Sequence, residues 1–272
     1  MSLVGKDAFG KPFELEQPAC RIVSLIPSIT ETLFILGAGD RVVGVSKFCT
    51  EPPSGVAAKT KVGGQKNPRV DTIVSLMPDL VIANVEENHK QHVEAMRAAG
   101  LRVFVTYPRT VREGIRLIRD LGILTGEGNR AKEIAAACDV ARVEVERQVN
   151  GRPPVRVFCP VWRKPYMTIN RDTYIHDVLR TCGAENVFQN RKDRYPKVTL
   201  AEMADLNPDI ILLANEPFPF SEQHLEDFRA FPGLVALRDG RIHFLDGKIL
   251  SWYGPRIAGS LGALADTLHS RG

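Results

Sequence analysis

The chain has 272 residues, of which 44% are hydrophobic and 25% are charged, a composition that excludes a disordered chain and leaves room for two globular domains. The formal net charge is only +4 and basic residues are interspersed with acidic ones, so nucleic acid is not expected as a partner. No apolar stretch approaches the ~20 residues of a membrane-spanning helix, and the opening residues lack the apolar segment of a secretory signal. We therefore expect an extracytoplasmic protein, periplasmic or membrane-anchored, if a signal has been removed from the chain, and a cytoplasmic one otherwise.

Residues 1–20 are predicted to form a loosely attached N-terminal arm, and a regular pattern begins at Arg21. A buried strand is expected over residues 22–25, followed by a helix that Thr30 caps and Gly37 ends. A second strand is expected over residues 42–45. The next segment, residues 46–67, is rich in Pro, Gly, Lys and Thr, and is expected to be a long exposed loop of the kind that often carries function.

Helices and strands alternate through the rest of the first half. Helices are expected over residues 71–77 and 88–99, and strands over residues 80–83 and 101–106. Such alternation predicts a parallel sheet flanked by helices.

Residues 109–151 form the middle of the chain and are predicted to be helical. A first helix is expected over residues 111–124 and a second over residues 129–149. The second helix has one apolar face, made of Ile134, Cys138, Ala141, Val145 and Val149. At ~1.5 Å per residue this helix would be about 30 Å long, enough to span two lobes and to restrict their opening.

The second half of the chain repeats the order of the first. A strand over residues 155–159 corresponds to the strand that begins at Arg21, and Gly183-Ala-Glu-Asn186 corresponds to Gly37-Ala-Gly-Asp40. Leu206-Asn-Pro-Asp209 corresponds to Leu76-Met-Pro-Asp79, and a glutamate follows each, at Glu86 and Glu216. We therefore predict an α/β fold with two similar lobes, residues 21–108 and 152–272, whose parallel-type sheets are joined by a long backbone helix.

Five cysteines are spread along the chain without the paired short spacing of a zinc or iron-sulfur site. Their odd number leaves at least one thiol free. Cys138, Cys159 and Cys182 have apolar neighbours and are expected to be small core residues.

No catalytic constellation is visible, because the sequence lacks a Gly-rich phosphate loop, a nucleophile elbow and an Asp-rich metal motif. His89 and His92 lie three residues apart on one predicted helix, one turn after Glu86, and could ligate a transition metal. A polar helix surface explains the same spacing and is preferred. The chain is therefore not expected to be an enzyme, to bind a metal at these histidines or to carry an intrinsic cofactor.

Several stretches make the chain similar to the class III solute-binding proteins of ABC importers, in which a backbone helix joins two lobes. They are Arg21-Ile-Val-Ser-Leu-Ile-Pro-Ser-Ile-Thr-Glu31, Leu36-Gly-Ala-Gly-Asp40, Val42-Val-Gly-Val45, Leu76-Met-Pro-Asp-Leu-Val-Ile-Ala83, Cys182-Gly-Ala-Glu-Asn186, Pro208-Asp-Ile-Ile211 and Gly254-Pro-Arg256. The resemblance implies a monomeric protein that holds a metal chelate in the cleft between its lobes and delivers it to an ABC permease.

Val45-Ser-Lys-Phe-Cys-Thr-Glu-Pro-Pro53 is closest to the cobalamin-binding members of that family, and it implies that Phe48 lines the cleft. A pocket tryptophan of those members corresponds to Asn84 here. Their two glutamates that dock on the transporter align with Lys90 and Ala201, so Glu86 or Glu87 and Glu202 or Glu216 are the nearby substitutes. Cys182 would belong to a disulfide of that subfamily, but no cysteine follows it.

Ligands of α/β lobes gather at the carboxyl ends of the strands. In the first lobe this selects Lys47, Phe48, Gln65, Lys66, Asn84 and Glu86, and in the second lobe Trp162, Arg163, Tyr166, Trp252 and Tyr253. The aromatic side chains would stack on a corrin or porphyrin ring, and the basic ones would meet phosphate, amide or carboxylate groups. Packing within a lobe and solvated surface charge are the alternatives.

Cobalamin or a related corrinoid is the predicted ligand. A ferric siderophore or haem is the first alternative, and haem would require a tyrosine over the iron, with Tyr166 or Tyr253 as candidates. A chelatase-like metal enzyme, which would direct His89, His92 or another histidine into the cleft, is the alternative of another class. An intracellular corrinoid-salvage protein is the third.

Overall fold

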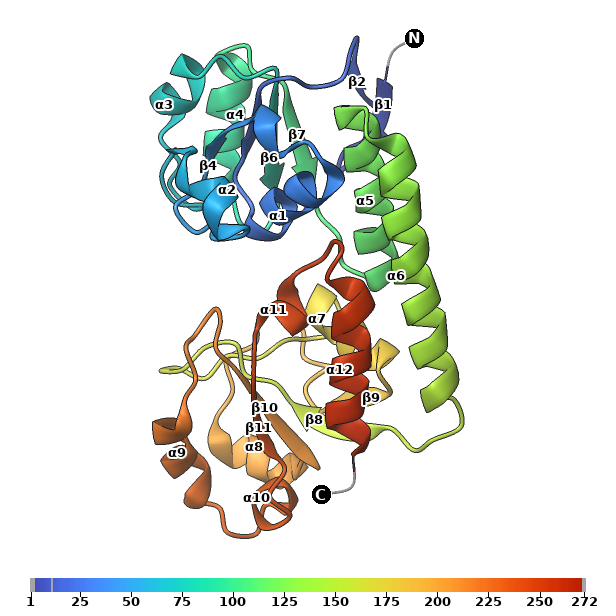
Figure 1. Ribbon diagram of the computed structural model, residues 1–272. Coiled ribbons are helices and arrows are strands. Elements are labelled where there is room, and N and C mark those ends of the chain that lie inside the picture. Colours follow the sequence, from blue (N-terminus) through green and yellow to red (C-terminus); the bar gives the residue numbers. More distant parts are fainter. Residues whose placement is uncertain (1–2, 11, 271–272) are drawn as a thin grey trace. The chain divides into compact units, whose positions relative to one another are not determined.

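The computed structural model describes residues 3–10 and 12–270, which form two compact units (Figure 1). Unit 1 runs to Pro108 and includes residues 112–138 and 253–255. Unit 2 comprises residues 109–111, residues 139–252 and the residues from Arg256 onward. Each unit has its own sheet, so the prediction of two lobes is confirmed.

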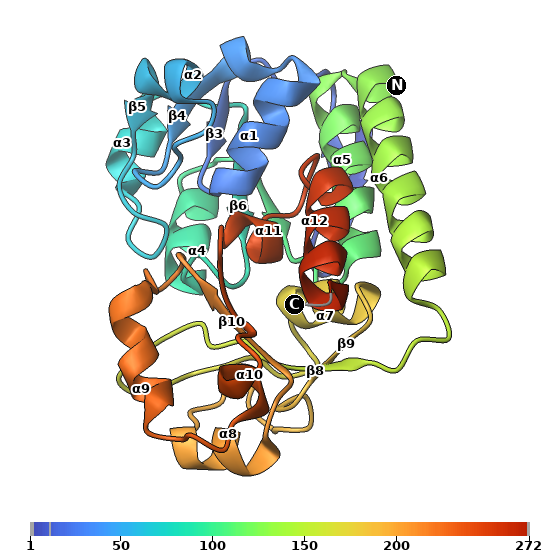
Figure 2. The same cartoon turned by 60° about the horizontal axis from the view of Figure 1, so that its bottom comes forward.

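The sheet of unit 1 has the strand order β5-β4-β3-β6-β7, and all its neighbouring strands are parallel. The strands are β3 (Ile22–Ser24), β4 (Val42–Val45), β5 (Thr60–Lys61), β6 (Leu80–Asn84) and β7 (Val103–Thr106). The helices are α1 (Pro27–Leu36), η1 (Gly39–Arg41), α2 (Pro53–Ala57), α3 (Val70–Ser75), α4 (Lys90–Ala98) and α5 (Val111–Thr125). Helices cover both faces of the sheet, with α1 on one face and α4 on the other (Figure 2).

The sheet of unit 2 has the order β11-β10-β8-β9 and is also parallel. Its strands are β8 (Val155–Phe158), β9 (Ala184–Asn186), β10 (Ile210–Ala214) and β11 (Ile242–Leu245). The helices are α7 (Tyr174–Thr181), α8 (Leu200–Leu206), η2 (Glu222–Leu225), α9 (Glu226–Arg229), α10 (Val235–Arg238), α11 (Lys248–Ser251) and α12 (Ile257–His269). Phe158, Phe188 and Phe228 are at most 2% exposed and lie in its core.

The two sheets repeat one topology, because β9-β8-β10-β11 follows the same order as β4-β3-β6-β7. The turns before β6 and β10 also match. Met77 and Asn207 both have positive φ, 45° and 44°. Asp79 then accepts the backbone N–H of Arg21 at 3.0 Å, and Asp209 accepts that of Arg156 at 2.8 Å. The repeated Leu-X-Pro-Asp sequence thus forms the same turn in both units.

Two local predictions in unit 1 are wrong. Helix α1 begins at Pro27, which suits the first helical position, so Thr30 lies inside the helix and does not cap it. Its buried hydroxyl instead donates to the Ser24 hydroxyl at 2.8 Å and the Ile26 carbonyl at 3.0 Å. The segment of residues 46–67 is not one exposed loop, because it contains α2, β5 and fully buried Val62. Gly37 does end α1, with φ of 94°.

Strands β1 (Leu3–Lys6) and β2 (Pro12–Leu15) pair antiparallel at the start of the described chain. The ring of Phe13 packs edge-on against Phe104 of β7, with centroids 5.2 Å apart, and the Ala8 N–H donates to the Val105 carbonyl at 2.7 Å. Packing and backbone hydrogen bonds therefore hold these residues, in contrast to the loose attachment that the sequence indicated.

Helix α6 (Gly128–Val149) is the predicted long helix, and its residues are divided between the two units at Cys138 and Asp139. Cys138 and Val145 of the predicted apolar face are buried, and Ile134, Ala141 and Val149 are partly buried. None of the five cysteines forms a disulfide, and Cys138, Cys159 and Cys182 are buried as predicted. Burial raises the pKa of the Cys159 and Cys182 thiols to about 12, so both stay protonated.

Within residues 3–10 and 12–270, no helix combines the length and the apolar character needed to cross a membrane.

Candidate functional site

Asn84 ends β6 and organises the loop that follows it. Its side-chain N–H₂ group donates to the Thr106 hydroxyl at 3.2 Å and to the Tyr253 hydroxyl at 3.1 Å. Its side-chain oxygen accepts the backbone N–H groups of Glu86 at 2.8 Å and Glu87 at 3.3 Å. Asn84 is 3% exposed, and both the N–H₂ group and the oxygen of its side chain are hydrogen-bonded within unit 1. The structure therefore gives this residue a positioning role rather than an open surface for a ligand.

Phe48 is the most open aromatic residue among those predicted to contact a ligand, with 51% of its surface exposed. The ammonium of Lys47 lies 4.9 Å from the centre of its ring, a cation–π contact. A Cβ at Gly64 would lie 3.6 Å from Phe48, an ordinary contact distance, but only 2.5 Å from the side-chain oxygen of Asn67. Unit 1 thus presents a flat apolar face with a cation beside it.

Two loops of unit 1 are tied together next to this face. The Asn88 side chain donates to the Gln65 carbonyl at 2.8 Å, and the Lys66 ammonium donates to the Glu86 carbonyl. The backbones after β5 and β6 are therefore linked. Lys66 is exposed, whereas Gln65 and Glu86 are half-buried.

Tyr253 belongs to unit 1, where its hydroxyl accepts the hydrogen bond from Asn84. Burial and the nearby Glu87 carboxylate raise the pKa of this phenol above its usual range. A phenol that is engaged and hard to deprotonate is a poor ligand for ferric iron, so the structure does not favour Tyr253 in that role.

An aromatic cluster lies at the carboxyl edge of the unit 2 sheet. The ring of Trp162, from the loop after β8, packs edge-on against Phe218, from the loop after β10, with centroids 5.7 Å apart. Phe218 in turn lies 4.7 Å from Phe220 and 5.3 Å from the His224 ring. Trp162 is 44% exposed, so part of its ring stays open although Phe218 packs against it.

Arg163 and Tyr166 follow Trp162 and both bind Asp227 of α9. The guanidinium donates two hydrogen bonds to the carboxylate, at 2.7 and 2.9 Å, and the Tyr166 hydroxyl donates a third at 2.5 Å. These bonds from Arg163, and then that from Tyr166, hold the pKa of Asp227 below its usual range. Asp227 therefore neutralises the positive charge that Arg163 was predicted to offer to a ligand.

Trp252 was predicted to stack on the ligand, but it is only 7% exposed. The Lys248 ammonium lies 5.0 Å and the Arg256 guanidinium 5.3 Å from its ring centre, and its indole hydrogen-bonds to Glu216. The Trp252 ring is therefore buried and makes cation–π contacts with two basic side chains of unit 2. Arg256 directly precedes α12.

The glutamates considered for transporter docking have structural partners in unit 2. Glu202 forms a capping box with Thr199 at the start of α8 and an ion pair with Arg191. Glu216 is half-buried, and its carboxylate accepts the Ser251 hydroxyl at 3.3 Å as well as the indole of Trp252. In unit 1, Glu87 is half-buried.

Glu216 should make stability depend on pH, because burial raises the pKa of its carboxyl. The folded protein then binds this proton more readily than the unfolded chain, so stability is greatest below the unfolded pKa of about 4.3 and falls as pH rises through the folded pKa. We expect Glu216→Gln to melt at a higher temperature than wild type at pH 7, and at the same temperature near pH 4. Calorimetry at both pH values checks this, with exposed Glu222→Gln as the control. A lower melting temperature of Glu216→Gln at pH 7 would contradict the assignment.

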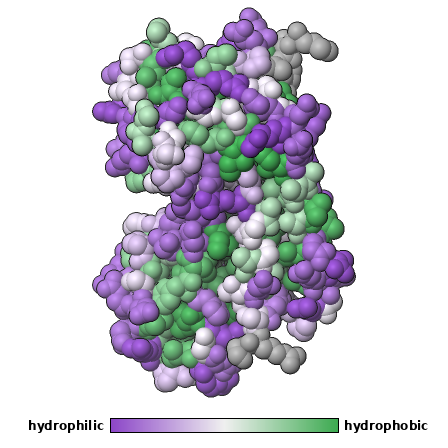
Figure 3. Space-filling view, in the orientation of Figure 1, coloured by the Kyte–Doolittle hydropathy of each residue, from purple (hydrophilic) through white to green (hydrophobic). Residues whose placement is uncertain are grey.

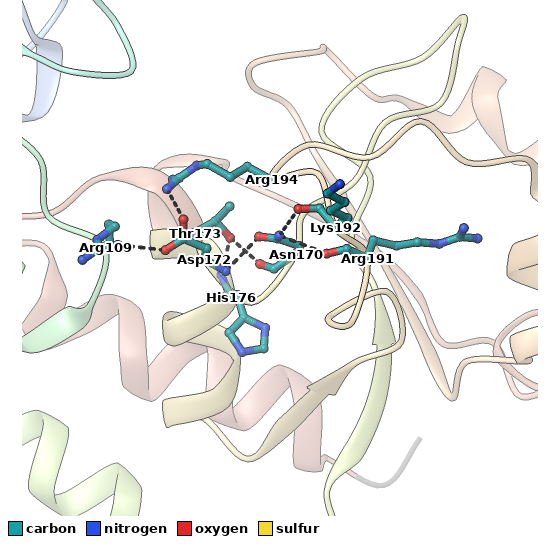
Figure 4. Close-up of polar contacts among 8 residues, drawn as sticks. All are labelled: Arg109, Asn170, Asp172, Thr173, His176, Arg191, Lys192 and Arg194. Atoms are coloured by element: carbon teal, nitrogen blue, oxygen red, sulfur yellow. Dashed lines mark hydrogen bonds and ion pairs between the residues drawn. The ribbon is translucent and has the colours of Figure 1, made fainter.

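A second polar cluster of unit 2 centres on Asp172, which lies between two arginines (Figure 4). Its carboxylate accepts Arg109 at 3.0 Å and Arg194 at 2.8 Å. The Asn170 side chain also holds the carbonyl of Arg191 at 3.1 Å. These contacts fix the segment before α7 to the segment after β9.

No group of three or more His, Cys, Asp or Glu side chains that could hold a metal ion occurs in the described part of the chain. The rings of His89 and His92 are 6.3 Å apart at the start of α4. Phe218 and Asp227 were missed by the sequence analysis. Their only local signals were a Phe-Pro-Phe run and an acidic residue in a short helix.

Apolar side chains also gather on the visible face of unit 2, in the region where β10 and β11 lie (Figure 3). Edge strand β11 contributes Phe244, which is 40% exposed.

The chain belongs to the periplasmic binding protein family, whose model matches residues 22–249. It is 25% identical to a vitamin B12-binding protein of Vibrio parahaemolyticus over 195 residues, which cover 72% of this chain and 70% of the relative. It is 27% identical to the vitamin B12-binding protein of Salmonella typhimurium, with 73% of each covered.

Two solved structures share the fold. The vitamin B12-binding protein BtuF of Vibrio cholerae has a TM-score of 0.82 and 24% identity, covering 92% of this chain and 97% of that one. The haem-binding protein RhuT of Roseiflexus has a TM-score of 0.79 and 24% identity, with 92% and 97% covered. The predicted membership among solute-binding proteins is thus confirmed, as is the prediction that the chain is a binding protein and not an enzyme.

Proposed function

We propose that this protein is the substrate-binding component of an ABC importer and that its ligand is cobalamin or a related corrinoid. Its relatives include vitamin B12-binding proteins that cover more than 70% of the chain. The observation that carries the ligand class is the pairing of Arg163 and Tyr166 with Asp227. Because of this pairing, the exposed part of the Trp162 ring lies next to a guanidinium whose charge is neutralised and a phenol whose hydroxyl is hydrogen-bonded.

Trp162 and Phe48 each offer a flat apolar surface at the carboxyl edge of a parallel sheet. Both are more than 40% exposed, and Phe218 packs edge-on against Trp162. A corrin ring bears amide side chains, which need hydrogen bonds but no ionic partner, so an uncharged aromatic surface suits it. Lys47, next to Phe48, is available for a phosphate of the ligand.

The proposal keeps residues 21–108 and 152–272 as the two lobes and residues 109–151 as the connector. It places the protein outside the cytoplasm, as the family's periplasmic name supports. It takes the protein to be a monomer with an ABC permease as its partner. Docking on the permease would use Glu87 in the first lobe. Glu202 and Glu216 are less suited to docking because each has internal partners.

Calorimetric titration of the purified protein with cyanocobalamin, cobinamide, haemin and a ferric siderophore tests the proposal. We expect the two corrinoids to bind more tightly than haemin or the siderophore. Binding of haemin or the siderophore, without binding of a corrinoid, would instead identify the protein as a haem or siderophore receptor of the same family. Binding of none of them would overturn the proposed ligand class.

A further inference from the structure

Asp227 occupies an unusual position, because one carboxylate holds two side chains of the same loop. Arg163 and Tyr166 are three residues apart after β8, whereas Asp227 is 64 residues further along the chain than Arg163. The side chains of Arg163 and Asp227 are 21% and 23% exposed, so the pair lies at the surface of unit 2. The Tyr166 ring is half-buried and stacks on Phe220 at 6.3 Å, with an angle of 19° between the rings.

Arg163 and Tyr166 are the two groups that an iron porphyrin would use here. A guanidinium binds the carboxylate of a haem propionate through two parallel hydrogen bonds. A tyrosine oxygen is an established axial ligand for haem iron. In this protein Asp227 engages both groups, since its carboxylate binds the guanidinium fork and accepts a hydrogen bond from the phenol.

The phenol is also held in its protonated form. Burial, and then the hydrogen bond to Asp227, raise the pKa of Tyr166 above its usual range. Ligation of ferric iron needs the phenolate, so loss of this proton would place two negative charges side by side. His224 is the nearby titratable group that acts on Asp227, and it favours the carboxylate.

We propose that Asp227 is a specificity-determining residue that excludes haem and other carboxylate-bearing iron chelates, by engaging Arg163 and Tyr166. This inference rests on the proposed function, in which the loop of Trp162 faces the ligand. The Asp227 carboxylate cancels the charge of Arg163, so an anionic ligand would meet only the exposed ammonium of Lys164 in residues 159–168. It also leaves the aromatic surface of Trp162 in place for an uncharged ring.

The test measures haemin binding by absorbance titration in wild type and two variants, Asp227→Asn and Asp227→Ser. Removal of the carboxylate frees the guanidinium for a charge-assisted hydrogen bond, so haemin should bind at least about tenfold more tightly to both variants. The bound haemin should show the charge-transfer band of tyrosinate-ligated ferric iron. In the Asp227→Asn background, Tyr166→Phe should abolish this band, and Arg163→Gln should reverse the gain in affinity.

Glu226→Gln is the matched control, because it makes the same change in charge one residue away and frees Arg229 instead. It should leave haemin affinity at the wild-type value. Asn and the smaller Ser perturb the site differently, and far-UV circular dichroism identifies which of the two Asp227 variants is folded. Haemin affinity is compared with wild type for each folded variant. Unchanged haemin affinity in a folded Asp227 variant, or an equal gain in Glu226→Gln, would overturn the inference. Wild-type titration with cyanocobalamin reports separately on the proposed function.

Discussion

Replacement of Asn84 by alanine should destabilise the protein by about 2–4 kcal/mol, because it removes four hydrogen bonds of a buried side chain. The Thr106 and Tyr253 hydroxyls would lose their shared donor, and the N–H groups of Glu86 and Glu87 would lose their acceptor. Urea denaturation followed by circular dichroism measures the change. Asn67→Ala, at an exposed position of the same unit, should stay within about 0.5 kcal/mol of wild type. A loss below 1 kcal/mol for Asn84→Ala would show that the network matters little.

The two tryptophans should respond oppositely to truncation. Trp252→Ala removes a ring that is 7% exposed and should cost about 3–5 kcal/mol of stability. Trp162→Ala removes a 44% exposed ring and should change stability far less. It should instead weaken cobalamin binding about tenfold through lost stacking.

Thermal denaturation and calorimetric titration of both variants measure the two effects. Acrylamide should quench the emission of Trp252→Ala, which retains Trp162, more strongly than that of Trp162→Ala. Equal quenching of the two folded variants would contradict the assigned exposures, and full cobalamin affinity in Trp162→Ala would place the ligand elsewhere.

The sheets could be predicted from the sequence because their signals are local. Apolar runs such as Ile22–Ser24 and Ile210–Ala214 are bounded by turns, and each Pro-Asp pair fixes the start of a strand. The repeated topology follows from these same turns. Helix α6 was visible for a similar reason, since its apolar positions recur at spacings of three and four.

The state of the site residues could not be predicted in this way. Whether Arg163 is free or neutralised depends on Asp227, which is 64 residues away along the chain. Trp252 looked like a ligand contact because it lies in a loop, but the positions of Lys248 and Arg256 around its ring depend on how α11 and α12 begin. Residue type and loop position identify candidates, and tertiary packing decides which of them stay open.

The membership of Tyr253 in unit 1 has a consequence for the order in which a nascent chain can fold. The strands of the unit 1 sheet lie before residue 107, so they are complete early in translation. Asn84 nevertheless lacks one of its hydrogen-bond partners, the Tyr253 hydroxyl, until residue 253 has left the ribosome. Until residue 254 follows, Cys138 also lacks the Gly254 carbonyl that its thiol approaches at 3.8 Å. Domains generally fold as units during synthesis, N-terminal first. In this protein, unit 1 cannot complete its hydrogen bonds until residues 253–255, which are synthesised late, are available. A ribosome-stalled chain that ends before residue 253 should therefore be cleaved by protease at residues 84–88 more easily than the full chain.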